Sequence, residues 1–297
     1  MSKHMKGIIY ATITSTLYGL SFMVTKGATD SLGVFELLGP RFLLALVVMM
    51  LLKITGVIKL TITKEKLLSF LPVTLIFPLT YFIAETYGIM MTTAGESGII
   101  IASIPLVTLL ISSVVSKAIP KRNEVIGIIM TLIGLLMIVL SAGLSVSLNL
   151  PGYLLLFVAV LSYAMYTILV FSKTSVTATE KTFLSILTST VVFVILGFFE
   201  SGSLLNFIRP FRELNFLVPI LYLGLLSTVV AFCFNMLSIE HLGASRASSF
   251  EGLTTFISII SGVLFLKEPF GLYQGISALL IIAGIIIANL EPRKVKN

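Results

Sequence analysis

Ionisable side chains are rare inside the long apolar runs of this 297-residue chain, and they are the first candidates for chemistry. Glu85 and Glu251 each place a carboxylate within such a run, and Arg41 places a guanidinium there. A charge at the centre of a bilayer costs about 2.5–3.5 kcal/mol on insertion scales, so its presence indicates a function. We therefore expect Glu85 and Glu251 to bind a substrate ammonium group or to exchange a coupling proton.

Glu85 also has a purely structural alternative. Glu85 and Arg41 both fall in the outer halves of their runs, so the two side chains can form a static ion pair in which Arg41 is a structural charge. Tyr81 lies one helical turn before Glu85, on the same face. Asn235 lies 150 residues after Glu85, the same offset that relates the two predicted repeats. The sequence leaves both interpretations of Glu85 open.

Hydroxyl groups accompany these candidates. Ser248, Glu251 and Thr255 recur at spacings of three and four, which places them on one helical face. Tyr163, Tyr166 and Thr16 add further hydroxyls in two other runs. A face of small and polar residues is typical of a wet cavity wall, and equally of close helix packing. A buried tyrosine, likewise, finds a hydrogen-bond partner in most cores.

The elements that must position these residues are membrane helices. Apolar residues make up 57% of the chain and charged residues 11%, whereas soluble domains carry about 25% charged residues. A bilayer core takes about 20 helical residues to cross, and lipid satisfies no open backbone. The fold class is therefore all-α integral membrane, with ten predicted transmembrane helices at 7–26, 33–53, 67–90, 95–116, 122–141, 151–171, 181–200, 215–237, 243–266 and 271–290.

Lysine and arginine predict the orientation. With the N-terminus inside, fifteen of the twenty fall in inner segments, four in outer segments, and Arg41 within a span. Such an asymmetry indicates a multi-pass protein of the cell membrane with both termini cytoplasmic. The net charge of +7 is thus a topology signal, and no nucleic acid is expected as a partner.

The ten spans divide into two five-helix repeats, residues 1–143 and 150–297. Five is an odd number, so the second repeat is expected to be inverted relative to the first. At an offset of 150, residues 94–140 align with 244–290 without a gap, and Gly134 meets Gly284. Inverted repeats are a transporter architecture with the substrate near the membrane centre.

Two stretches resemble a known family. Gly243-Ala-Ser-Arg-Ala-Ser-Ser-Phe250 and Gly262-Val-Leu-Phe-Leu-Lys-Glu-Pro-Phe270, followed by Gly284, resemble the second repeat of EamA-type transporters of the drug/metabolite superfamily. The first repeat is similar at Ala94, Ser103–Val107, Gly127 and Gly134. The resemblance implies alternating access, import or efflux, and a substrate that is an amino acid, metabolite, amine or drug.

The sequence also departs from that family pattern. Ala118 replaces a glutamate that Glu268 retains, and Thr255 stands where a proline is usual. Glu251 occupies a position that the family pattern keeps apolar or neutral, which points to something particular about the substrate or the coupling ion.

Other classes of protein fit less well. Asp30 is the only aspartate, Cys233 the only cysteine, and the two histidines are far apart, so we expect no metal, no cofactor and no enzyme. An integral membrane enzyme acting on a lipid-soluble substrate is the alternative. The expected partners are a small-molecule substrate, the bilayer, and a proton or another ion. Glycine-rich faces at Gly127, Gly134, Gly275 and Gly284 permit either a homodimer or packing within a monomer.

Overall fold

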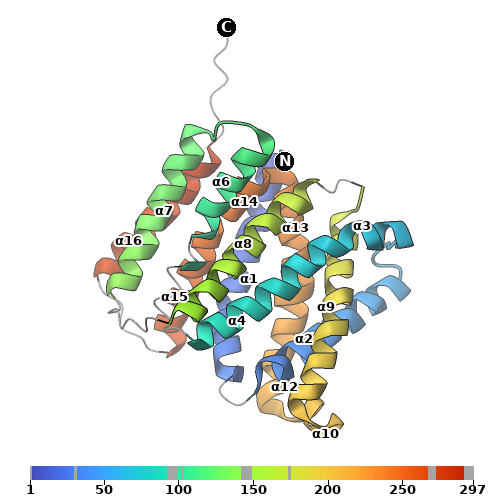
Figure 1. The fold of residues 1–297 in the computed structure, drawn as a ribbon. Coiled ribbons are helices and arrows are strands. Elements are labelled where there is room, and N and C mark those ends of the chain that lie inside the picture. The colour runs from blue at the N-terminus through green and yellow to red at the C-terminus, as the bar shows by residue number, and fades with distance from the viewer. Residues whose placement is uncertain are drawn as a thin grey trace.

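The computed structural model describes residues 2–29, 32–91, 100–101, 103–141, 149–172, 175–266 and 272–290 (Figure 1). Every regular element in these ranges is helical, which confirms the all-α class. The elements are α1 Lys3–Thr29, α2 Val34–Ile54, α3 Lys64–Thr74, η1 Leu75–Thr80, α4 Tyr81–Met91, α6 Ile104–Ser116, α7 Arg122–Ser141, α8 Leu150–Ser172, α9 Ala178–Ser201, α10 Leu204–Phe207, α11 Arg209–Arg212, α12 Leu214–Leu221, η2 Tyr222–Val230, α13 Ala231–Leu242, α14 Ala244–Ser248, α15 Glu251–Leu266 and α16 Leu272–Asn289.

Five stretches of the described chain are long and apolar enough to cross a membrane. They are Val34–Ile54, Lys64–Gly88, Leu150–Ser172, Ala178–Ser201 and Leu214–Leu242. Shorter apolar helices occupy Ile104–Ser116 and Gly275–Asn289. The count of ten spans stays a prediction. The boundary between the predicted repeats falls largely outside the described residues, as do Ala94 and residues 267–270 of the family motifs.

The predicted span 67–90 is interrupted near its middle. Phe77 has φ −139° and ψ 127°, which is extended rather than helical, and Pro78 follows it inside η1. A proline brings no N–H to the helical ladder and disfavours helical backbone at the residue before it, which accounts for the break. The predicted span is present as Lys64–Gly88, with non-helical backbone at Phe77. The consequence is that the Phe77 ring, 2% exposed, points into the core.

The predicted span 215–237 lies within one continuous helical stretch, Leu214–Leu242, whereas the predicted span 243–266 is divided. The first comprises α12, η2 and α13, where η2 is a π-helix. The second divides at Ser249 and Phe250, between α14 and α15. Ser248 Oγ donates to the Ser245 carbonyl at 2.9 Å and Ser249 Oγ to the Arg246 carbonyl at 2.7 Å. Such side-chain bonds compete with the helical ladder, and Ser248 and Glu251 lie on two successive helices, α14 and α15.

The helices of the two predicted repeats pack against each other in matched pairs. Helix α7 packs on α16 at one flank of the molecule and α2 on α9 at the other (Figure 1). In the interior α1 packs on α13 and α15, whereas α8 packs on α4 and α6. Helices α1 and α8 are the first helices of the two predicted repeats. The partners of α1 (α13 and α15) occupy the same places in the second repeat as the partners of α8 (α4 and α6) occupy in the first.

The α7–α16 contact shows the same correspondence between the two predicted repeats at the level of single residues. A Cβ atom at Gly127 would lie 2.4 Å from the Gly284 carbonyl oxygen, and one at Gly134 would lie 2.9 Å from the Ser277 carbonyl oxygen. The offset of 150 residues converts one contact into the other. These glycines therefore serve packing within the chain, where helix backbones approach closely. Gly275 differs, because no atom lies within 4 Å of its Cβ position.

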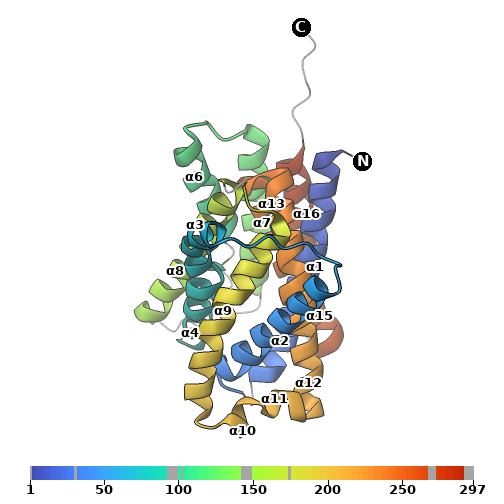
Figure 2. The same ribbon diagram turned by 90° about the vertical axis from the view of Figure 1, so that its right-hand side faces the viewer.

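The two ends of the molecule are distinct (Figure 2). The start of α1, the α6–α7 connection and the end of α16 lie at one end, and α10 and α11 lie at the other. His4 Nε2 is 3.0 Å from the Asn289 carbonyl oxygen, which places the beginning of α1 beside the end of α16.

A Gly284→Ala protein is expected to be less stable than wild type by about 1–3 kcal/mol, the usual cost of overpacking. The new methyl group would lie 2.5 Å from both the Gly127 carbonyl oxygen and Thr131 Oγ1, so α7 and α16 must separate. The measurement is the melting temperature of the purified protein in detergent, followed with a maleimide dye that reacts with Cys233, the chain's only cysteine.

The matched control is Gly275→Ala on the same helix. Its methyl group meets no neighbour, and alanine favours helix more than glycine does, so the melting temperature should stay equal or rise. Equal melting temperatures for Gly284→Ala and wild type would contradict the close α7–α16 contact.

Candidate functional site

Two carboxylates and three tyrosines meet where α4, α8, α13 and α15 come together. Tyr163 and Tyr166 lie three residues apart on α8, so both point from one helical face. The Tyr163 hydroxyl donates to Glu251 Oε1 at the start of α15. The Tyr166 hydroxyl donates to Asn235 Oδ1 on α13 at 2.8 Å. Asn235 Nδ2 donates in turn to the Tyr163 oxygen at 3.2 Å, which joins the two bonds into one network.

A second carboxylate lies on α4. The Tyr81 hydroxyl donates to Glu85 Oε1 at 2.7 Å across one helical turn. Tyr81 is 9% exposed and Glu85 8%, so this pair is buried, whereas Glu251 is half-buried. The two carboxylates lie near enough to interact electrostatically. Glu85 and Glu251 therefore belong to one polar centre within an apolar interior.

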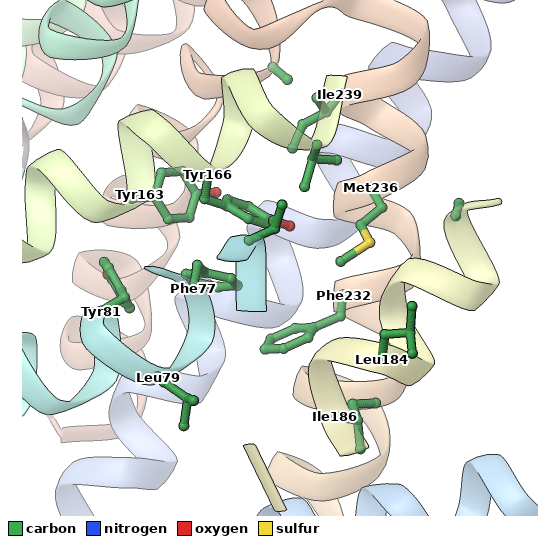
Figure 3. Packing of buried hydrophobic residues seen from close by; sticks show 14 of the residues in the cluster. Phe77, Leu79, Tyr81, Tyr163, Tyr166, Leu184, Ile186, Phe232, Met236 and Ile239 are labelled. Carbon is green, nitrogen blue, oxygen red and sulfur yellow. The ribbon is translucent and has the colours of Figure 1, made fainter. Parts of the chain in front are cut away.

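The tyrosines that bond the carboxylates belong to an aromatic cluster, in which Figure 3 labels Phe77, Tyr81, Tyr163, Tyr166 and Phe232. Phe77 stacks on Tyr166 with ring centroids 4.3 Å apart, and it contacts the rings of Tyr81 and Tyr163 at 5.3 and 5.5 Å. Tyr81 and Tyr163 are 5.6 Å apart. Phe232 of α13 closes the group, 5.5 Å from Phe77. The break at Phe77 thus supplies the central ring of the cluster.

Tyr18 of α1 borders the same centre. Its ring packs edge-on against Phe232 at a centroid distance of 6.4 Å. Its hydroxyl is buried and has no hydrogen-bond partner within the described part of the chain. It lies close enough to Tyr166, Glu251 and Arg41 to interact with them electrostatically. Tyr18 therefore adds a buried hydroxyl to this centre.

Arg41 of α2 is held by hydroxyl groups of η2. Its Nε donates to Thr228 Oγ1 at 2.8 Å and its Nη2 to Ser227 Oγ at 3.3 Å, both on η2. Its guanidinium carbon lies 5.1 Å from the centroid of the Phe82 ring. No ion pair joins Arg41 to Glu85 among the residues that the structure describes, so the static pair of the alternative interpretation is not formed.

The remaining sequence candidates lie apart from this network. Ser248 is 1% exposed and bonds within α14. The Thr255 hydroxyl donates to the Glu251 carbonyl at 3.2 Å, and the Thr16 hydroxyl to the Thr12 carbonyl at 2.8 Å, each within its own helix. Helical spacing alone could not separate these residues from Tyr163 or Glu251. Phe77 and Phe232 escaped the sequence analysis because a phenylalanine in an apolar run carries no signal, although Pro78 marks the break.

Taken together, the apolar helices and the polar centre enclosed among them define a multi-pass helical membrane protein. The comparisons with known proteins give the family. The model of the EamA-like transporter family matches residues 5–140 and again 150–290. The chain belongs to the EamA-like transporter family, and it is a membrane transporter.

Curated relatives agree with this assignment. The chain is 29% identical over 301 residues to "Uncharacterized transporter YcxC" of Bacillus subtilis strain 168, covering 99% of this chain and 96% of that protein. It is 24% identical to an "Uncharacterized transporter" of Archaeoglobus fulgidus, covering 95% of this chain and 98% of the relative. A solved crystal structure superposes with a TM-score of 0.76 over 98% of this chain and 99% of the other, at 15% identity, which shows the fold.

Proposed function

We propose that this protein is a proton-coupled secondary transporter that moves a small amine-bearing molecule across the cell membrane by alternating access. The observation that carries the proposal is the polar centre at Glu251 and Glu85. Both carboxylates lie within predicted spans, and hydroxyl groups bind them through hydrogen bonds. Within the described chain neither carboxylate has a cationic partner, so each is free for a substrate ammonium group or a proton.

The arrangement of the helices supports alternating access. The polar centre takes Tyr18, Phe77, Tyr81 and Glu85 from the first predicted repeat, and Tyr163, Tyr166, Asn235 and Glu251 from the second. The paired contacts of α1 and α8, and of α7 and α16, are those expected of two inverted repeats. A motion of one repeat against the other would open the centre first to one side and then to the other.

The coupling step needs one group that changes its protonation as the centre opens. Glu251 fits this role because it is half-buried and its partner Tyr163 keeps a hydroxyl donor directed at it. A proton on Glu251 would leave when the substrate ammonium arrives, so each substrate exchanges for a proton. We propose the end that holds the start of α1 and the end of α16 as the cytoplasmic one, because Lys3 and Lys6 lie in the first turns of α1, and Lys121, Arg122 and Arg246 line a pocket with Leu290.

The test is proton flux in proteoliposomes that hold the purified protein and a pH-sensitive dye. Amino acids, amines and cationic drugs are added one at a time, and labelled uptake of the same compounds is measured in parallel. Substrate-dependent proton movement is the expected result. Uptake without proton movement would contradict proton coupling but not transport. No uptake of any compound would contradict the proposed function.

A further inference from the structure

Basic side chains line a pocket at the end of the molecule that holds the start of α1 and the end of α16 (Figure 2). The pocket has a volume of about 280 Å³, and its lining residues are Lys121, Arg122, Asn123, Glu124, Arg246 and Leu290. Three cationic side chains against one carboxylate leave a net charge of +2. A hollow with this excess of positive charge favours an anion.

The carboxylate in this pocket positions one of the cations. Arg246 Nε lies 3.4 Å from Glu124 Oε1, and the two side chains are only 11% and 14% exposed. Lys121 and Arg122 form no ion pair within the described residues. Arg122 is also the first residue of the 20-residue helix α7, and the N-terminal end of a helix attracts negative charge. The described part of the chain therefore leaves the positive charge of this pocket uncompensated.

An apolar groove adjoins the basic pocket, and Leu290 lines both. The groove has a volume of about 500 Å³, and most of its lining comes from Ile8, Phe250, Leu253, Ile282, Ile285 and Ile286. Hydrogen bonds also connect the two linings. Asn289 of the groove donates through Nδ2 to Ser249 Oγ at 3.1 Å, and Ser249 Oγ donates to the carbonyl of Arg246 at 2.7 Å.

Asn289 is a polar residue in this apolar groove, and one of its hydrogen bonds is not made. Its side chain is 7% exposed, and its Oδ1 atom has no hydrogen-bond partner within the described part of the chain. Buried polar atoms normally have a partner, so an acceptor without a donor needs an explanation. A ligand with a hydroxyl group near the boundary between groove and pocket would supply that donor.

Exposed isoleucines place the basic pocket at the level of lipid headgroups. Ile126 and Ile129 of α7 and Ile286 of α16 are 38%, 47% and 57% exposed, and all three lie in predicted spans, where exposed apolar side chains face lipid. Lys121 and Arg122 come directly before the first of them in the chain. Basic residues at the end of a span lie at the membrane interface.

We propose that the basic pocket and the apolar groove together bind one anionic glycerophospholipid. Its phosphate lies among Lys121, Arg122 and Arg246, and one acyl chain lies along the groove. Guanidinium groups bind phosphate through paired hydrogen bonds, and basic pockets between membrane helices suit anionic headgroups. A free phosphate ion would fill the pocket and leave the groove empty, whereas a lipid matches both cavities.

This inference goes beyond the proposed transport function and does not depend on it. The pocket joins the start of α7, in the first predicted repeat, to α14 and the end of α16, in the second. A lipid bound there contacts both repeats, so it should stabilise the folded protein.

The experiment is a series of melting temperatures of the purified full chain in detergent, followed with the Cys233 dye. The additives are dioleoylphosphatidylglycerol, dioleoylphosphatidylcholine and inorganic phosphate. The two lipids share their acyl chains and differ in net charge. We expect saturating phosphatidylglycerol to raise the melting temperature by about 5 °C, phosphatidylcholine to raise it much less, and inorganic phosphate to leave it unchanged.

A double variant assigns the effect to the basic pocket. Lys121→Gln/Arg122→Gln should weaken the apparent affinity for phosphatidylglycerol about 10- to 30-fold, measured from the midpoint of the lipid titration. The matched control is Lys53→Gln/Lys59→Gln, which removes the same two charges from residues that line neither cavity. All four side chains are exposed, so both double variants should fold.

A single variant tests the groove. Ile286 lines the groove, so the larger side chain of Ile286→Trp should occupy space that the acyl chain needs and reduce the stabilisation by phosphatidylglycerol. Leu279→Trp is the matched control on the same helix, because Leu279 is 71% exposed and lines neither cavity.

An equal response to phosphatidylglycerol in the Lys121/Arg122 double variant and in its control would overturn the headgroup site. An equal response of wild type to the two lipids would overturn the role of the charge. If inorganic phosphate stabilises wild type as much as phosphatidylglycerol does, the pocket binds a free anion and the lipid is the wrong occupant. None of these measurements involves transport, so this inference and the proposed function can fail separately.

Discussion

A Glu251→Gln protein is expected to fold and insert normally but to lose substrate-driven proton movement by about 100-fold or more, the least that a proton-transferring group usually contributes. Glutamine has nearly the shape of glutamate and keeps the oxygen that accepts from the Tyr163 hydroxyl. It cannot take up or release a proton in the physiological range. The measurement is dye-detected proton flux in proteoliposomes, with labelled uptake of the same substrate beside it.

Three further variants test whether the missing carboxylate is the cause of the lost proton movement. Glu65→Gln, an exposed carboxylate at the start of α3, is the matched control and should behave as wild type. Tyr163→Phe removes the hydroxyl donor but leaves a carboxylate that still titrates, so proton movement should fall less than in Glu251→Gln. Glu85→Gln should lose most transport through weaker substrate binding. Wild-type activity in both Glu251→Gln and Glu85→Gln would rule out a carboxylate mechanism.

Much of the architecture could be predicted because lipid restricts it. The apolar runs require helices, and the helices lie where the length of each run places them, with boundaries that differ by a few residues. The breaks at Phe77 and at Ser249 were not predicted. A proline inside an apolar run is compatible with a kink, a break or a straight helix, and packing decides between these. The serine hydroxyls of α14 compete with the backbone in a way that hydropathy does not register.

The sequence predicted which charged residues belong to the candidate site, but it did not predict their hydrogen-bond partners. Glu85, Glu251 and Arg41 stand out because ionisable groups in apolar runs are rare. Their partners lie far away in the chain: Glu251 bonds a tyrosine 88 residues before it, and Arg41 bonds a threonine 187 residues after it. A single sequence carries no information about such contacts. That is why Tyr163 and Thr16 were equal candidates in the sequence and lie in different surroundings in the structure.

The second large effect concerns stability, and it is expected to be asymmetric within one ion pair. Lys181 is 1% exposed, and its Nζ donates to Glu240 Oε1 at 2.6 Å and to the Val170 carbonyl at 3.0 Å. It therefore joins α9 to α13 and α8. Glu240 is 31% exposed. Removal of one partner from a buried pair is costly because the other charge stays buried alone.

Glu240→Gln leaves the buried ammonium of Lys181 without a counter-charge. Breaking a buried pair costs about 3–5 kcal/mol, and because water reaches Glu240 we expect about 2–3 kcal/mol here. Lys181→Met leaves a carboxylate that water can solvate and a carbonyl that loses one donor, so about 1 kcal/mol is expected. Melting in detergent with the Cys233 dye measures both, and Glu240→Gln should melt at the lower temperature.

The exposed pair Arg209–Glu213 provides the control. Its side chains are 46% and 47% exposed, so Glu213→Gln should change stability by less than about 0.5 kcal/mol. If Lys181→Met proved more damaging than Glu240→Gln, the bonds of the ammonium group to the Val170 carbonyl and to Glu240 would outweigh the cost of a buried charge without a counter-charge. The predicted order instead means that the buried charge of Lys181 adds little stability by itself, and that Glu240 is needed because it keeps this charge tolerable.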